Sequence, residues 1–262
     1  MTTLSVVIPT YNTAAMTLRC VRAVLEAKPF EVIVVDDGST DETSALLSNE
    51  NVRVVRLDEN HGFAFAANRG VAEANGEIIL LLNSDAIVER DALRAFITAF
   101  DEDDRLGVAG AQLLNEDGTL QWSGGPAPTL LWMIAVITGL GRRLSRNARK
   151  TDVEWVSGAA MAFRAEVWKP LSERYRFYCQ DIDFCLRARS EQWEVRVIED
   201  ARVTHLLGAT IKESPKASPE LLWRDLLTWG RAHYGRVWGF FASAILLPLI
   251  AIRRSAAGRK RA

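Results

Sequence analysis

The chain has 262 residues, which fits one large α/β domain or one domain with an appendage. Its formal net charge is -1, and this near-neutral balance argues against a nucleic-acid-binding protein. Three cysteines without a paired short spacing give neither a disulfide framework nor a zinc site, and they suit a reducing compartment.

The first hundred residues alternate short apolar runs with segments of helical periodicity. The predicted strands cover residues 4–8, 32–35, 52–57 and 78–82. Helices are predicted around residues 18–25, 63–74 and 93–100, and the spacing of Ser39 and Glu42 predicts a capping box at the start of another. This alternation predicts a mostly parallel sheet covered by helices on both faces.

The pattern loosens after about Val108. Strands are predicted over residues 107–114 and 155–164, with a hairpin or turn over residues 119–125 between them. Farther along, residues 180–190 and 219–234 are predicted to be helical, and residues 195–198 and 201–205 extended.

Polar side chains follow three of the predicted strands. They are Pro9-Thr10-Tyr11-Asn12, Asp36-Asp37-Gly38-Ser39 and Asn83-Ser84-Asp85. Ligands in open α/β sheets bind outside the carboxyl ends of the strands. Three acidic groups on one rim need a compensating cation, and carboxylates suit Mg²⁺ or Mn²⁺, which also bind substrate phosphates. The structural alternative for each segment is a turn or helix cap.

Several blocks together resemble the glycosyltransferase family 2 enzymes, over about residues 4–210. These blocks are residues 6–12, 34–41, 81–85, 155–160 and 177–185, and residues 60–70 resemble a segment of the rhamnosyltransferase-like branch. The resemblance implies an α/β GT-A (Rossmann-like) fold with a mostly parallel sheet. The apolar segment and basic tail at the end of the sequence predict a C-terminal helical, membrane-associating appendage. Residues 1–215 would form the GT-A domain, with a nucleotide-binding half to about residue 105 and an acceptor and catalytic half after it. Residues 216–262 would form the appendage.

The resemblance also assigns roles to individual residues. Asp181 would be the catalytic base, because inversion requires a carboxylate that takes the proton of the acceptor hydroxyl. Asp85 and His205 would bind the Mg²⁺ or Mn²⁺ ion, although His205 could also be an ordinary strand histidine. Asp37 would accept a hydrogen bond from a pyrimidine imide, with Tyr11 stacked on the base. The donor-binding set is Pro9, Thr10, Tyr11, Asp36, Asp37, Asn68, Asn83 and Ser84, and the acceptor-binding set is Ser157, Gly158 and Asp183, the last with a structural role as its alternative.

Two positions depart from the family pattern. Asn83 stands where the first aspartate of the D-x-D element is expected, and Gln180 stands where glutamate is common. The implied function is inverting transfer of a sugar from dTDP-rhamnose or a UDP-sugar to a glycan or lipid-linked acceptor in cell-surface polysaccharide synthesis. A nucleotide-sugar-binding relative with weak or no activity is the alternative. One of Trp122, Trp155, Trp168 and Trp193 is a candidate for stacking on a sugar, with core packing as its alternative.

Residues 237–252 contain no charged residue and precede a basic tail with Arg253, Arg254 and three further basic residues. This segment is shorter than the about 20 residues that a spanning helix needs, so we expect an interfacial anchor or a buried core helix. Residues 129–140 are also apolar and precede a basic stretch. With no signal peptide predicted at the amino terminus, the expected location is the cytoplasmic face of the cell membrane.

Overall fold

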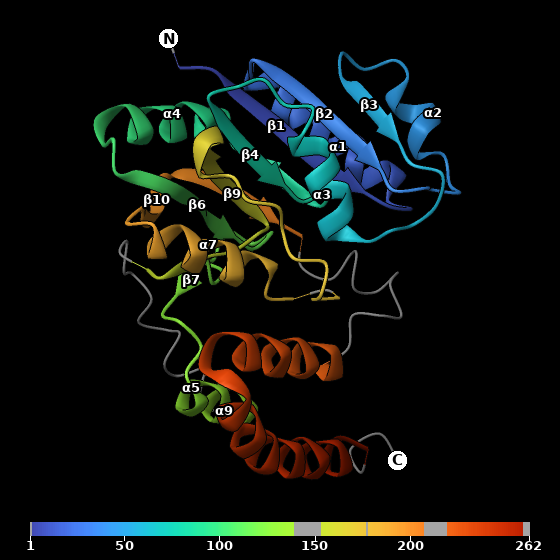
Figure 1. Cartoon of the computed structure of the whole chain (residues 1–262). Helices are drawn as coiled ribbons and strands as arrows, with labels where there is room; N and C mark the ends of the chain where they lie inside the picture. The colour runs from blue at the N-terminus through green and yellow to red at the C-terminus, as the bar shows by residue number, and fades with distance from the viewer. Residues whose placement is uncertain (1, 139–152, 177, 207–218, 259–262) are drawn as a thin grey trace.

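A computed structural model describes residues 2–138, 153–176, 178–206 and 219–258. In this part of the chain, eight strands form one sheet in the order β3-β2-β1-β4-β9-β6-β10-β5, and β7 pairs with β8 beside it (Figure 1). The strands are β1 Leu4–Thr10, β2 Glu31–Asp36, β3 Arg53–Arg56, β4 Ile78–Leu82, β5 Ala86–Val88, β6 Leu106–Leu114, β7 Gly124–Gly125, β8 Trp155–Val156, β9 Ala160–Arg164 and β10 Glu194–His205. The helices are α1 Ala14–Glu26, α2 Thr43–Leu47, α3 Phe63–Val71, α4 Ala92–Glu102, α5 Leu130–Thr138, the 3₁₀ helix η1 Ala165–Val167, α7 Gln180–Ser190 and α9 Pro219–Gly258.

The amino-terminal half is the parallel part of the sheet. Strands β3, β2, β1 and β4 pair in parallel, as the alternation of apolar runs and helices predicts. Their carboxyl ends therefore lie at one edge, where the polar segments after β1, β2 and β4 meet.

Strand β9 runs antiparallel to both of its neighbours, β4 and β6. The prediction of one strand over residues 155–164 is wrong, because the chain leaves the small β7-β8 sheet at Val156 and enters the main sheet at Ala160. The two predicted segments 195–198 and 201–205 form one strand, β10, with a shift of register between Ile198 and Arg202.

Two hydrophobic cores lie on opposite faces of the sheet, because successive strand residues point to opposite sides. Val7 and Ile33 belong to the core shared with α3 and α7, whereas Val6 and Ile8 belong to the core shared with α1 and α4. Helix α3 lies close to the sheet, since a Cβ atom at Gly70 would come within 2.4 Å of the Val7 side chain. Helices on both faces confirm that part of the predicted fold.

Helix α9 is two helices joined at Gly235, whose φ of 87° breaks the helical backbone. Trp223, Leu226 and Trp229 of its first half belong to the core that also contains residues of α7. The second half lies beside α5, below the main sheet in Figure 1. Over the described residues, none of the helices combines the length and the apolar character needed to cross a bilayer. The basic stretch after residue 140 lies outside the described residues.

The capping box predicted from Ser39 and Glu42 is wrong. Helix α2 begins at Thr43, and the carboxylate of Asp41 accepts the Thr43 amide at 3.0 Å. Ser39 instead accepts the Asn12 amide through its hydroxyl at 2.9 Å, which ties the loop after β2 to the loop after β1. A local motif is thus replaced by a contact between two loops of the candidate site.

Candidate active site

The loops after β1 and β2 form one end of the site. Thr10 is paired with Asp36 in the parallel register, and its carbonyl accepts the Asp37 amide at 2.9 Å. Pro9 lies inside β1 and is buried. Tyr11 is 42% exposed, so its ring is accessible beside this pair of loops, as base stacking would require.

Asp36 and Asp37 have different environments although they are adjacent. Asp36 is fully buried, and its carboxylate accepts the Ser39 amide at 2.9 Å and pairs with Arg56 at 3.2 Å. A third contact comes from the Ser44 hydroxyl. These partners hold the turn after β2 and leave Asp36 with no accessible surface in this conformation.

Asp37 closes the loop that leads into α3. Its two carboxylate oxygens accept the amides of His61 and Gly62 at 2.9 and 2.8 Å. Burial raises the pKa of Asp37, and the two amide hydrogen bonds oppose that rise because they favour the charged form. Each oxygen keeps a second lone pair, so the carboxylate can still accept a hydrogen bond from a bound base.

Asn68 and Ser84 lie within internal hydrogen-bond networks. The Asn68 amide bonds both backbone groups of Leu171, at 2.7 and 3.0 Å, and so joins α3 to the segment before α7. The Ser84 hydroxyl lies 3.2 Å from that of Thr13, within a buried hydroxyl cluster with Thr10. Both side chains therefore have internal hydrogen-bond partners in this conformation.

The short strand β5 brings Asp85 to His205. It pairs antiparallel with the end of β10, so that His205 lies opposite Ala86 and its Nε2 is 3.3 Å from the Asp85 carboxylate. The Asn83 amide nitrogen is 3.4 Å from the same ring nitrogen. Gln121 donates to the His205 carbonyl at 2.6 Å, and its amide oxygen lies 3.3 Å from Nδ1.

This arrangement fits one divalent cation bound together with a diphosphate. A carboxylate and an imidazole nitrogen converge, and Gln121 fixes the other ring nitrogen in the way that outer-shell partners orient ligating histidines. Within the described residues, no three His, Cys, Asp or Glu side chains cluster as a metal site. Mg²⁺ commonly takes one or two protein ligands and completes its shell with phosphate oxygens and waters, so two ligands are sufficient.

Asp181 lies at the first turn of α7, where Cys179 adopts a left-handed backbone with φ of 72°. Its Oδ2 accepts the Gly158 amide at 2.9 Å, and its Oδ1 accepts the Ile182 amide at 2.8 Å. Burial raises the pKa of Asp181, and these amides partly offset the rise. A fixed carboxylate with a raised pKa is suited to take up a proton.

The Asp85–His205 pair and Asp181 are connected through backbone hydrogen bonds. Asn83 donates its amide to the Ala159 carbonyl at 3.0 Å, next to the Gly158 amide that binds Asp181. Ser157 in turn donates to the Ser123 carbonyl at 2.9 Å. One rim of the sheet therefore carries Asp85, His205, Gly158 and Asp181.

Two residues of α7 have internal partners. Asp183 accepts the Tyr175 hydroxyl at 2.9 Å and pairs with Arg187 at 3.0 Å, in keeping with the structural alternative considered for it. Gln180 is buried and donates to the Tyr175 carbonyl at 3.1 Å. A glutamate could not donate in that way unless it were protonated, so glutamine suits this local structure.

Asp225 of α9 is a residue that motif reasoning missed. It is 1% exposed, and its carboxylate accepts the amides of Arg176 and Tyr178 at 3.2 and 2.9 Å. These amides belong to the segment directly before α7. Asp225 therefore fixes the segment that leads into the helix carrying Asp181. A helical segment rich in tryptophan gives no sign that one aspartate points toward a loop some 50 residues earlier in the sequence.

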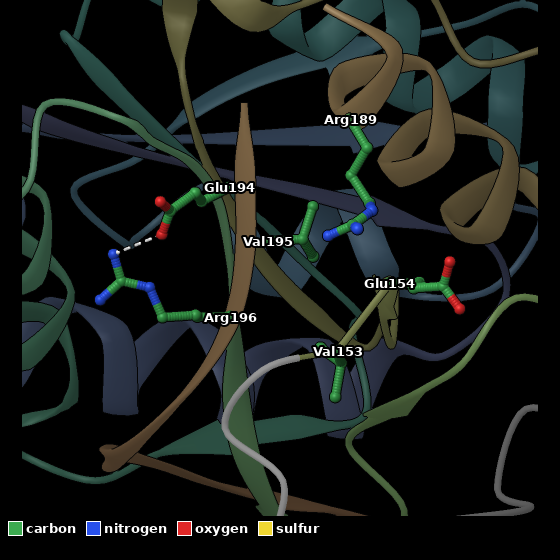
Figure 2. A pocket seen from close by; sticks show the side chains of 6 residues that line it. All are labelled: Val153, Glu154, Arg189, Glu194, Val195 and Arg196. Carbon is green, nitrogen blue, oxygen red and sulfur yellow. Dashed lines mark hydrogen bonds and ion pairs between the residues drawn. The ribbon is translucent and has the colours of Figure 1, made fainter. Parts of the chain in front are cut away.

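A separate cavity of about 350 Å³ lies at the other end of β10 (Figure 2). Arg189 projects from α7 toward it, and Arg196 pairs with Glu194 at 3.2 Å on its wall. The remaining lining residues are Val153, Glu154 and Val195. Because His205 ends β10 and Glu194 begins it, this cavity is distinct from the rim that carries Asp85 and Asp181.

Comparison with known proteins decides the family. The model of the family described as glycosyl transferase family 2 matches residues 5–171, which is more than half of the chain. The chain belongs to glycosyl transferase family 2. The predicted GT-A fold is confirmed, whereas the rhamnosyltransferase-like branch stays a prediction.

Curated relatives of this family 2 chain match over part of their length. Glycosyltransferase GlyG of Streptococcus pneumoniae serotype 4 is 34% identical over 41% of the chain and 38% of its own length. Succinoglycan biosynthesis protein ExoO of Rhizobium meliloti is 38% identical over 41% of the chain and 30% of its length. The hexosyltransferase Agl10 of Haloferax volcanii is 26% identical over 62% and 54%. The chain thus spans about a third to a half of these relatives.

Solved structures share the fold at low identity. S. aureus TarS, residues 1–349, has a TM-score of 0.58 and 22% identity, covering 80% of this chain and 62% of its own. GalNAc-T7, solved with UDP, GalNAc and Mn²⁺, has a TM-score of 0.60 and 17% identity over 79% and 44%. The mannosyltransferase PcManGT of Pyrobaculum calidifontis, solved with GDP-Man and Mn²⁺, has a TM-score of 0.56 and 17% identity over 100% and 81%.

Replacing Asp225 tests its role in holding the segment before α7. Asp225→Asn substitutes one acceptor oxygen by an NH₂ group facing a backbone amide, which should lower the free energy of unfolding by about 1–3 kcal/mol. Urea denaturation gives this value. The matched control is Asp200→Asn at an exposed position of β10, where we expect a change within about 0.5 kcal/mol. Equal stability of the two variants would contradict the assignment.

Proposed function

We propose that the chain is an inverting glycosyltransferase that transfers a sugar from a nucleotide-diphosphate donor to a saccharide acceptor. The observation that supports this most directly is the common rim described above, where the Asp85–His205 pair and the amide-bound Asp181 are joined through Asn83 and Ala159. A donor diphosphate and an acceptor hydroxyl would then meet at one edge of the sheet.

The donor would bind across the ends of β1, β2 and β4. Asp37 would accept a hydrogen bond from the imide of a uracil or thymine base, and the exposed ring of Tyr11 would stack on that base. Asp36 would act indirectly, by holding the turn that carries Asp37. This end of the site would also be shaped by Pro9, Thr10, Asn68, Asn83 and Ser84. The candidate donors are dTDP-rhamnose and UDP-sugars.

Asp85 and His205 would hold a Mg²⁺ or Mn²⁺ ion against the diphosphate. A cation bound there supplies charge neutralisation for the departing diphosphate. His205 is already oriented by Gln121, so little rearrangement is needed to present Nε2. Asn83 in place of an acid removes one negative charge near the diphosphate and leaves the Asp85 carboxylate as the charged ligand.

Asp181 would take the proton of the acceptor hydroxyl. As that oxygen forms its bond to the anomeric carbon, the bond from this carbon to the diphosphate breaks, and the electron pair leaves with the diphosphate. The amides of Gly158 and Ile182 fix the carboxylate, and each oxygen keeps a lone pair for the proton. Ser157 and Gly158 would border the acceptor, while Asp183 would support α7.

The acceptor would be a glycan or a lipid-linked saccharide at the cytoplasmic face of the membrane, in the synthesis of a cell-surface polysaccharide. The second half of α9 carries exposed apolar side chains, and a basic tail follows them in the sequence. The exposed residues are Val237, Phe240, Phe241, Ile245 and Leu247. A helix of this kind favours insertion into the headgroup region of an anionic membrane surface.

Asp181→Asn tests the proposed chemistry. The amide cannot accept the acceptor proton, so we expect transfer to fall by about 10² to 10⁴-fold. Donor binding should persist, as measured by the thermal shift that UDP-sugars or dTDP-rhamnose produce with Mn²⁺. Asp200→Asn is the matched control and should transfer at the normal rate. Full transfer by Asp181→Asn would exclude this base, and donor binding without hydrolysis or transfer by the unmodified protein would favour a binding relative.

The raised pKa of Asp181 predicts where the rate falls with acid. The base must be ionised, so kcat is lost as pH falls through the folded-state pKa, which burial places above the ordinary range of aspartate. Donor and Mn²⁺ are kept saturating at every pH, so that their binding does not limit the measured rate. An acid limb in the ordinary aspartate range would contradict this assignment.

Vesicle binding tests the membrane surface. Phe241→Ser should weaken binding to vesicles containing phosphatidylglycerol by about tenfold, since burial of one phenylalanine contributes about 1.5–3 kcal/mol. Phe30→Ser is the matched control, because Phe30 and Phe241 are both 58% exposed and Phe30 lies in the loop before β2. Equal loss in both variants, or binding unaffected by either, would contradict the role of α9.

A further inference from the structure

Trp122 lies in the segment between β6 and β7, beside the proposed transfer site. We propose that its indole ring is the platform on which a pyranose ring of the acceptor saccharide stacks. The inference rests on the proposed function and deepens it, because it names the residue that would position the acceptor.

Trp122 differs from the other tryptophans in exposure. All eight lie within the described residues, and Trp122 alone among them is exposed, at 39%. Trp155 is buried and donates through Nε1 to the Pro126 carbonyl at 2.8 Å. Trp168 stacks on Phe163, and Trp193 covers Gly107, so these other candidates serve packing.

The Trp122 ring is held in place despite its exposure. Trp155 meets it edge-on at 4.9 Å between ring centroids, and Trp132 of α5 lies at 5.7 Å with an interplanar angle of 30°. Gly125 lies close to the ring, since a Cβ atom there would come within 3.2 Å of it. A ring fixed on several sides loses little conformational freedom when a ligand binds.

The neighbours of Trp122 connect it to both ends of the reaction site. The Gln121 side chain bonds the carbonyl of His205 at 2.6 Å. The Ser123 carbonyl accepts the Ser157 amide, one residue before the Gly158 amide that binds Asp181. Trp122 is therefore anchored on one side through the proposed metal ligand and on the other through the loop that holds the proposed base.

The chemistry of the ring matches a sugar. One face of a pyranose ring presents C–H groups with slight positive charge, and the face of an indole ring carries negative charge. The donor base and diphosphate are assigned in the proposed function to Tyr11, Asp37 and Asp85 at the ends of other strands, which leaves Trp122 for a sugar of the acceptor. The neighbouring α5 packs against α9, which places this platform next to the proposed membrane surface.

Fluorine NMR on the full chain labelled with 5-fluorotryptophan tests the platform directly. Single Trp→Phe variants assign the eight signals. The full chain is titrated with four probes, in the presence of diamagnetic Mg²⁺ and either UDP or dTDP. The probes are cellobiose, lactose, chitobiose and methyl α-rhamnopyranoside. At least one probe should shift the Trp122 signal, and Trp122→Ala should weaken its binding by about tenfold, which corresponds to about 1.4 kcal/mol.

Matched variants separate stacking from loss of structure. Trp122→Phe should retain part of the affinity, and Gly125→Ala should weaken binding because the Trp122 ring must move. Leu120→Ala removes a more accessible apolar side chain, 57% exposed against 39% for Trp122, and should leave affinity unchanged. The inference is overturned if no probe shifts the Trp122 signal, or if Trp122→Ala binds like the unmodified protein. Donor binding and donor hydrolysis are measured separately, and their absence would instead overturn the proposed function.

Discussion

The antiparallel pairing of β9 with β4 is the constraint on which the candidate site depends. Its register places Leu82 opposite Ala160, so the loop that follows β4 and the loop that precedes β9 leave the sheet side by side. One loop carries Asp85 and the other carries the Gly158 amide that binds Asp181. With a parallel β9, the loop before it would emerge at the opposite edge, and the groups assigned to metal binding and to proton transfer would lie a strand length apart.

The acidic residues of this rim differ in their surroundings, and this separates their roles. Asp36 pairs with Arg56 and is enclosed, whereas Asp37 and Asp181 each accept two backbone amides, and burial raises the pKa of both. In the proposed function, Asp36 would support a turn, Asp37 would contact the donor base and Asp181 would act as the general base.

The parallel half of the fold could be predicted from the sequence because its signals are local. Short apolar runs ending in Pro, Asp or Asn identify β1, β2 and β4, and residues 180–190 identify α7 by their helical pattern. The features that were missed depend on distant partners. Strand β5 has three residues and exists because it pairs with the end of β10, and Ser39 bonds Asn12 instead of capping α2. Asp225 likewise acquires its role only through a segment that precedes it by almost 50 residues.

Helix α9 connects the proposed membrane surface to the segment directly before α7. Its two halves are continuous in sequence and contact different parts of the protein. The first half contributes Trp229 to the core and Asp225 to the amides before α7. The second half exposes Phe240 and Phe241, and the two halves meet at Gly235, where the helical backbone breaks. The two halves pack on each other across this break, where Arg231 donates to the Ser243 hydroxyl at 2.9 Å. In the proposed function, the second half would lie on the membrane surface while the first half keeps its contacts with the segment before α7. The position of Asp181 would then be set by the protein core, and the membrane would set only where the acceptor enters.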